Sequence, residues 1–171
     1  MKKLSLKKYA FFSAIISIGI LIDQITKLLS VKFLQPKGTV PIIEDVIHLT
    51  YVENRGAAFG MLSDSRWVFM LVSTVAIIGM AVFLYSGLAS NLLYEISVAM
   101  IISGGIGNMI DRIALGYVVD MIDFRIINFA VFNGADSFVC VGAGLLVLAL
   151  VLDIVKEAKA KKDNGNDSDS Q

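Results

Sequence analysis

Four uncharged apolar runs divide the chain, and polar residues separate them. The runs cover residues 9–22, 67–94, 96–110 and 137–152. A membrane-spanning helix needs about 20 residues, so the second run is long enough to include a turn, which we place near residues 86–91. The last two runs are short and reach spanning length only by taking in charged residues at one end. The pattern therefore predicts four transmembrane helices, near residues 10–30, 67–86, 92–111 and 136–156.

The placement of lysines predicts the orientation of these helices. Lysines crowd both ends of the chain, and an even number of spans puts both termini on one side, which the positive-inside rule makes the cytoplasmic side. The segments 34–66 and 112–135 then lie on the outer face. Alternating apolar and polar residues, as in VIHLTYV at 46–52, predict short strands in the first of them. Residues 1–156 form the membrane domain, and the polar tail at 157–171 is expected to be cytoplasmic and disordered.

The composition is typical of an integral membrane protein. Hydrophobic residues make up 56% of the 171 residues and charged residues 18%, against about 25% charged in a soluble domain, and the mean hydropathy is +0.74. The net charge of zero gives no reason to expect a nucleic-acid partner. The basic start of the chain and its apolar continuation also resemble a cleaved signal peptide, but no small-residue cleavage site precedes Asp23. Cys140 lies in an apolar run, where we expect a packed thiol.

Nearly all the charges at membrane depth fall near the outer ends of the predicted helices. The first and third helices run outward and the fourth runs inward, so their charged ends meet in one leaflet. Ionisable groups within a membrane are costly, and their convergence predicts a functional site. The group consists of Asp23, Lys27, Asp111, Arg112, Asp120, Asp123 and Asp136.

Carboxylates carry the chemistry that this group offers. His48 is the only histidine and Cys140 the only cysteine, too few for a Ser–His triad or a zinc site, so we expect no metal and no cofactor. Two carboxylates about 3 Å apart share a proton, so one draws a proton from water while the other protonates a carbonyl oxygen, as in aspartic proteases. The last two helices can bring Asp136 to Asp120 or to Asp123, and spacing alone leaves both pairings open.

The same residues also have structural interpretations. Asn133 or Asp136, just before an apolar run, is a good helix N-cap, and Asp23 and Lys27 lie four residues apart on one helix, where they neutralise each other. If these roles were the only ones, the chain would be a membrane assembly factor. A proton or ion path is a further alternative, but it would place carboxylates along the depth of the bilayer instead of at one face.

Five ordered blocks of the sequence resemble bacterial lipoprotein signal peptidase, also called signal peptidase II. The blocks are DQITK (23–27), NRGAAFG (54–60), GGIGNMIDR (104–112), GYVVDMIDF (116–124) and FNGADS (132–137). The resemblance covers about residues 10–156. It implies a fold of four transmembrane helices with a small outer β-platform and a short outer helix.

The activity implied by this resemblance is that of an aspartic endopeptidase of the bacterial cytoplasmic membrane. Such an enzyme removes the signal peptide of a diacylglyceryl-modified prolipoprotein by cutting just before the lipidated cysteine, and we expect it to act as a monomer among membrane phospholipids. Asp120 and Asp136 match the catalytic pair, which leaves Asp123 at the rim. The positions that support the site or the substrate match Asn54, Gly56, Asn108, Arg112, Asn133 and Ala135, and the polar framework matches Asp23, Lys27 and Asp111.

Overall fold

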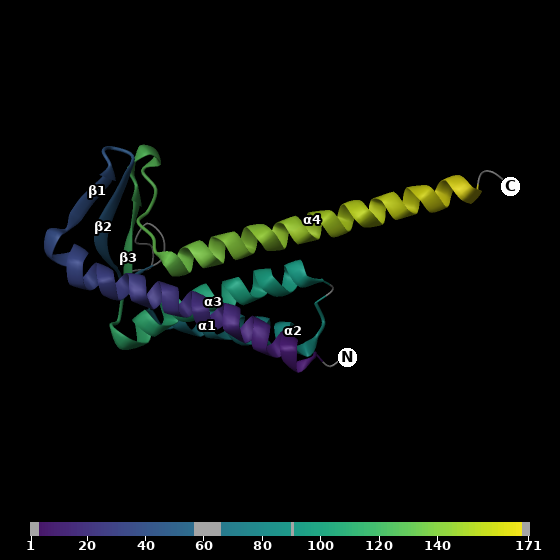
Figure 1. The fold of residues 1–171 in the computed structure, drawn as a ribbon, viewed down its shortest axis with the longest axis horizontal. Coiled ribbons are helices and arrows are strands. Elements are labelled where there is room, and N and C mark those ends of the chain that lie inside the picture. The colour runs from purple at the N-terminus through teal and green to yellow at the C-terminus, as the bar shows by residue number, and fades with distance from the viewer. Residues whose placement is uncertain (1–3, 57–65, 90, 169–171) are drawn as a thin grey trace.

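A computed structural model describes residues 4–56, 66–89 and 91–168. This part of the chain forms four long helices and a three-stranded sheet, which stands at the end of the helices opposite the N-terminus (Figure 1). The helices are α1 (Leu6–Leu29), α2 (Arg66–Ser86), α3 (Leu92–Ala114) and α4 (Gly134–Ser168), and the strands are β1 (Thr39–Ile43), β2 (Ile47–Asn54) and β3 (Val118–Phe124).

Three of these helical segments are long and apolar enough to cross a membrane. They cover residues 6–37, which include α1 and the turns after it, the whole of α3, and residues 134–161 of α4. The apolar part of α2 at residues 70–86 is shorter. Four helices therefore form where the sequence predicts them, and three of them meet the requirements of a span. The fourth span and the cytoplasmic termini stay predictions.

The helix ends follow local sequence signals. Asn91 caps α3, because its side chain accepts hydrogen bonds from the backbone N–H groups of Leu93 and Tyr94. Helix α4 continues past the predicted end at residue 156 to Ser168. This continuation crosses the segment expected to be disordered, where KEAKAKK at 156–162 consists of strong helix formers.

The sheet joins the two outer segments of the chain. Its strand order is β1-β2-β3 and both pairings are antiparallel. The predicted strands in segment 34–66 are confirmed, whereas β3 was not predicted. In place of the predicted short outer helix, the described residues contain only short helical turns, at Ser30–Leu34, Gln35–Lys37 and Arg125–Ile127. Residues 57–65 lie outside the described residues.

Two apolar clusters hold this arrangement together. One joins α1, α2 and α3 around Phe12, Leu84 and Ile102, all of them buried. In the other cluster, Val119 and Met121 of β3 pack against Leu34, which lies in the turn that follows α1. Because side chains alternate along a strand, Val119 and Met121 face this cluster while Asp120 faces the other way.

Candidate active site

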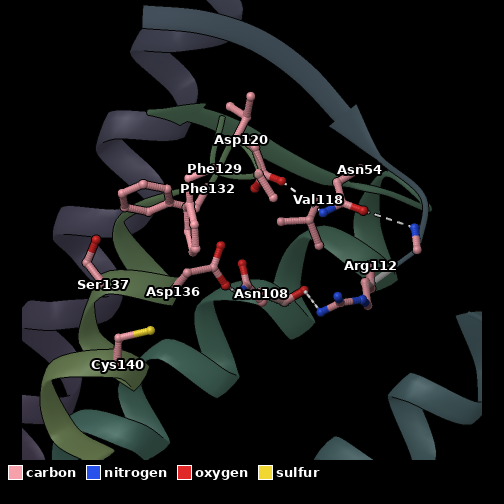
Figure 2. A pocket seen from close by; sticks show the side chains of 13 residues that line it. Asn54, Asn108, Arg112, Val118, Asp120, Phe129, Phe132, Asp136, Ser137 and Cys140 are labelled. Atoms are coloured by element: carbon pink, nitrogen blue, oxygen red, sulfur yellow. Dashed lines mark hydrogen bonds between the residues drawn. The ribbon is translucent and has the colours of Figure 1, made fainter. Parts of the chain in front are cut away.

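A pocket of about 390 Å³ lies between β3, α3 and the start of α4, and both Asp120 and Asp136 line it (Figure 2). Figure 2 shows the two carboxylates turned toward the space between β3 and α4. Asp123 does not line this pocket. Asp123 is three positions after Asp120 along β3, so its side chain faces the other side of the sheet. There it accepts hydrogen bonds from Thr50 and Arg125. Of the two pairings that spacing left open, the structure brings together Asp120 and Asp136, here called the pocket carboxylates.

Two asparagines hold the carboxylate of Asp120. The side-chain amide of Asn133 donates to its Oδ1 at 2.6 Å, and that of Asn54 donates to its Oδ2 at 2.9 Å. Asn54 reaches this position because β2 pairs with β3 two residues away, at Val52 and Asp120. Asp120 is only 1% exposed, so these amides replace the water that a surface carboxylate would bind.

A helix cap and a third asparagine hold Asp136. The backbone N–H of Asp136 donates to Asn133 Oδ1 at 2.9 Å, and the backbone N–H of Asn133 donates to Asp136 Oδ2 at 3.2 Å. This reciprocal pair is a capping box that starts α4. The other oxygen, Oδ1, accepts from the Asn108 amide at 2.7 Å. Of the two candidate caps, the structure confirms Asn133, and Asp136, its partner in the box, faces the pocket.

The oxygens of these asparagines are all engaged elsewhere, which fixes the direction of each amide. The backbone N–H of Gly56 donates to Asn54 Oδ1 at 3.0 Å. Asn108 Oδ1 accepts from the Lys27 ammonium and from the Asn133 amide, both at 3.0 Å. Since each oxygen is occupied, each NH₂ group points toward a pocket carboxylate. The site thus presents donors to all four carboxylate oxygens.

A buried ion network lies directly behind the pocket. Lys27 Nζ is 2.8 Å from Asp23 Oδ2 and 3.1 Å from Asp111 Oδ2, and all three side chains are at most 3% exposed. Asp23 also accepts from the backbone N–H of Ala135 at 2.8 Å, and Asp111 accepts from that of Val119 at 3.0 Å. The network therefore fixes, by hydrogen bonds, the backbone one residue before each pocket carboxylate. The expected mutual neutralisation of Asp23 and Lys27 is confirmed, with Asp111 as a third member.

Burial dominates the electrostatics of Asp120. It raises the pKa of Asp120 to about 6, helped by the charge of Asp136 and opposed by the hydrogen bonds from Asn54 and Asn133 and by the charge of Lys27. For Asp123, burial acts upward, but the hydrogen bonds from Thr50 and Arg125 outweigh it and lower the pKa. Asp120, which lines the pocket, therefore holds a proton more strongly than Asp123, which does not.

The remaining lining residues give the pocket an apolar wall and one cation. Arg112 is half-buried and donates to the backbone oxygen of Asn108 at 3.4 Å. The apolar wall includes Val118, Phe129 and Phe132, none of which the sequence pattern singled out. Cys140 corrects an expectation, because it is exposed and lines the pocket instead of being packed. Its position one helical turn after Asp136 is the signal that predicts this placement.

Among the described residues, no three His, Cys, Asp or Glu side chains come together as metal ligands do. The family model of Signal peptidase (SPase) II matches residues 15–152. The chain belongs to the signal peptidase II family.

Individual relatives agree with this assignment. The lipoprotein signal peptidase of Caldanaerobacter subterraneus is 50% identical over 77% of this chain and 90% of the relative. That of Halothermothrix orenii is 47% identical over 80% of this chain and 92% of the relative. A solved bacterial membrane enzyme, 29% identical, covers 90% of this chain and 94% of its own with a TM-score of 0.80. The family resemblance is thus confirmed, and it supports a multi-pass membrane protein that acts as a protease.

Proposed function

We propose that this protein is an aspartic endopeptidase that removes the signal peptide from diacylglyceryl-modified prolipoproteins, cutting just before the lipidated cysteine. The observation that carries the proposal is the pair Asp120 and Asp136 in one pocket, with an N–H donor on each of their four oxygens. The substrate class rests on the names of the relatives, which are lipoprotein signal peptidases.

The environments of the two carboxylates suggest different roles. Asp136 lies in the first turn of α4 and accepts a backbone N–H there, and the positive end of a helix dipole favours an ionised carboxylate. Asp120 is almost fully buried whereas Asp136 is partly exposed, and burial favours the protonated form. Asp136 is therefore the base and Asp120 the acid of this mechanism.

The reaction then proceeds without a covalent intermediate. Asp136 takes a proton from water as the water oxygen attacks the scissile carbonyl carbon, and Asp120 gives its proton to the carbonyl oxygen. The tetrahedral intermediate then collapses and its C–N bond breaks. One of its hydroxyl groups returns a proton to Asp120, and Asp136 donates its proton to the departing nitrogen. Asn54, Asn108 and Asn133 hold the carboxylates in place throughout, and Arg112 adds positive charge at the wall of the pocket.

The setting of this enzyme is the bacterial cytoplasmic membrane, with the pocket near the outer face. Strand β3 and the start of α4, which contribute residues to the pocket, lie at the end of the helices opposite the N-terminus (Figure 1), and the lysine-rich N-terminus belongs on the cytoplasmic side. The acyl chains of the substrate anchor it in the bilayer at about 0.8 kcal/mol per buried methylene, which keeps the scissile bond at the depth of the interface. We expect the chain to work as a monomer.

A turnover assay with matched carboxamide variants tests this function. Purified protein in detergent or lipid receives a diacylglyceryl-modified prolipoprotein, and release of the signal peptide is compared for the wild type, Asp120→Asn, Asp136→Asn and Asp123→Asn. We expect the first two variants to be inactive and the third to cut, because Asp123 lies outside the pocket. Normal cleavage by the Asp120 or Asp136 variant, or no cleavage by the folded wild type, would overturn the proposal.

A further inference from the structure

A second hollow lies where α1 ends, on the face of the sheet turned away from the pocket carboxylates. Leu34, one of its lining residues, packs on Val119 and Met121, which point away from Asp120. The wall is mostly apolar, and its polar residues are Ser30 and Lys37. The residues that form this groove include Leu29, Phe33, Leu34, Val40, Leu49 and Lys37.

Two lysine ammonium groups lie at or beside this groove. Lys37 lines it directly. Lys32 Nζ lies 5.1 Å from the centre of the Phe33 ring, which is itself part of the wall, a distance at which a cation and an aromatic ring attract each other. Both lysine side chains are exposed. The groove therefore combines an apolar surface with two cations at its side.

Among the described residues, no carboxylate lies within ion-pair distance of Lys32 or Lys37. The third cation between residues 30 and 56 behaves differently, because Arg55 pairs with Glu53 at 3.1 Å. On the same sheet Arg125 pairs with Asp123, also at 3.1 Å. Within the described part of the chain, the positive charge beside the groove therefore has no counter-ion.

The position of the groove identifies the kind of partner. It belongs to the end of the membrane-spanning segment 6–37, so its apolar wall lies at the depth where a helix leaves the hydrocarbon region. Leu29 and Phe33 are 50% and 57% exposed, and at this depth they meet acyl chains. Two lysines beyond an acyl-chain surface match an anionic head group at the end of an apolar tail.

We propose that the groove binds an anionic phospholipid of the surrounding bilayer, with an acyl chain along the apolar wall and the phosphate paired with Lys37 and Lys32. Leu34 contacts both the groove and the strand that carries Asp120. A bound lipid therefore braces the sheet from the side opposite the pocket. We expect the protein to be more stable in an anionic bilayer than in a zwitterionic one.

The test uses the full chain in nanodiscs of phosphatidylcholine alone or with phosphatidylglycerol. The measurements are the thermal unfolding midpoint and the lipid retained after extraction into detergent, read by native mass spectrometry. We expect phosphatidylglycerol to raise the midpoint of the wild type and to be retained preferentially. The double variant Lys32→Gln/Lys37→Gln should lose both effects and behave in either disc as the wild type does in phosphatidylcholine.

A matched variant and a soluble anion complete the design. Lys159→Gln/Lys161→Gln removes two exposed lysines at the far end of α4 and should keep the preference of the wild type. Inorganic phosphate added to phosphatidylcholine discs should not reproduce the stabilisation, because it brings no acyl chain. An undiminished preference in Lys32→Gln/Lys37→Gln, an equal loss in the control, or full stabilisation by phosphate would overturn the proposal. No readout depends on turnover, so failure here is separate from failure of the proposed peptidase activity.

Discussion

Lys27 Nζ donates to Asn108 Oδ1 at 3.0 Å, and this contact joins the buried ion network to the pocket carboxylates. Asn108 Oδ1 also accepts from the Asn133 amide at 3.0 Å, so two donors keep this oxygen turned away from Asp136. With Lys27 in place, that oxygen is occupied and the NH₂ group donates to Asp136 at 2.7 Å. Lys27 thus acts on Asp136 through Asn108 and also neutralises Asp23 and Asp111.

Replacing Lys27 by methionine should therefore damage both stability and turnover. It leaves Asp23 and Asp111 buried without a cation, and breaking a buried ion pair in this way costs about 3–5 kcal/mol. It also removes one of the two donors that orient Asn108, so protein that still folds should turn over at least about tenfold more slowly, which corresponds to about 1.4 kcal/mol. Thermal unfolding and kcat on a lipidated prolipoprotein measure the two effects.

Lys8→Met supplies the matched control for this prediction. Lys8 pairs with the buried Glu95 at 2.8 Å, far from the pocket near the start of α1. Its loss should lower the unfolding midpoint while the kcat of the folded fraction stays unchanged. An equal loss of kcat in both variants would show that Lys27 acts only through general stability.

Asn133 combines two functions that one substitution can separate. Its Oδ1 caps α4 by accepting from Asp136, and its Nδ2 donates to Asp120. Asn133→Asp keeps an oxygen for the cap, and Asp is as good a cap as Asn. It replaces the donor with an acceptor beside the buried Asp120. We expect little change in the helicity measured by circular dichroism and a loss of turnover of about 100-fold, about 2.7 kcal/mol; a variant with normal kcat would contradict the assigned donor role.

Asp120 should make the stability of the protein depend on pH. Its pKa is 3.8 in the reference state and about 6 in the folded chain, so the folded state binds the proton more tightly. Such a group stabilises the fold fully below pH about 4, and its contribution is lost as pH rises through about 6. The loss is roughly 3 kcal/mol at about 1.4 kcal/mol per pKa unit. Unfolding midpoints of the wild type and Asp120→Asn between pH 4 and 7 measure it; parallel curves would exclude Asp120 as the source.

The sequence predicts the helices well because each apolar run can be recognised from its own residues. It does not predict β3, since that strand forms only by pairing with β2, which lies far away in the chain. This omission is also why spacing alone could not choose between Asp120 and Asp123. Once residues 118–124 form a strand, the two side chains point to opposite faces, and only Asp120 faces α4.

The polar contacts of the site were predictable in kind but not in detail. Asp23 and Lys27 are four residues apart in one helix, so their ion pair follows from local geometry. The hydrogen bonds from the Ala135 backbone N–H to Asp23 and from Lys27 to Asn108 join segments that are distant in sequence. Such contacts depend on how the helices pack, and the pattern of apolar residues does not specify that packing geometry precisely enough to place individual hydrogen bonds.

Close packing of α3 against α4 sets the position of Asp136, and Gly104 permits it. A Cβ atom at Gly104 would overlap the backbone oxygen of Ala135 and lie 2.7 Å from Val139 Cγ2. Backbone gives way less readily than a flexible side chain, so Gly104→Ala must push the start of α4 away from α3. Asp136 would move with it, away from Asn108. We expect the free energy of unfolding to fall by about 1–3 kcal/mol, as is usual for overpacking, which lowers the unfolding midpoint. We also expect a reduced kcat.

Gly144→Ala is the matched substitution on α4. A Cβ atom there meets nothing within 4 Å, and alanine is favoured over glycine in a helix by about 1 kcal/mol. This variant should therefore unfold at the same temperature as the wild type or higher, with unchanged turnover. Thermal unfolding and kcat of the two variants, measured side by side, separate a contact effect from a general sensitivity of the helices to alanine. If Gly104→Ala is as stable and active as Gly144→Ala, the approach of α4 to α3 does not position Asp136.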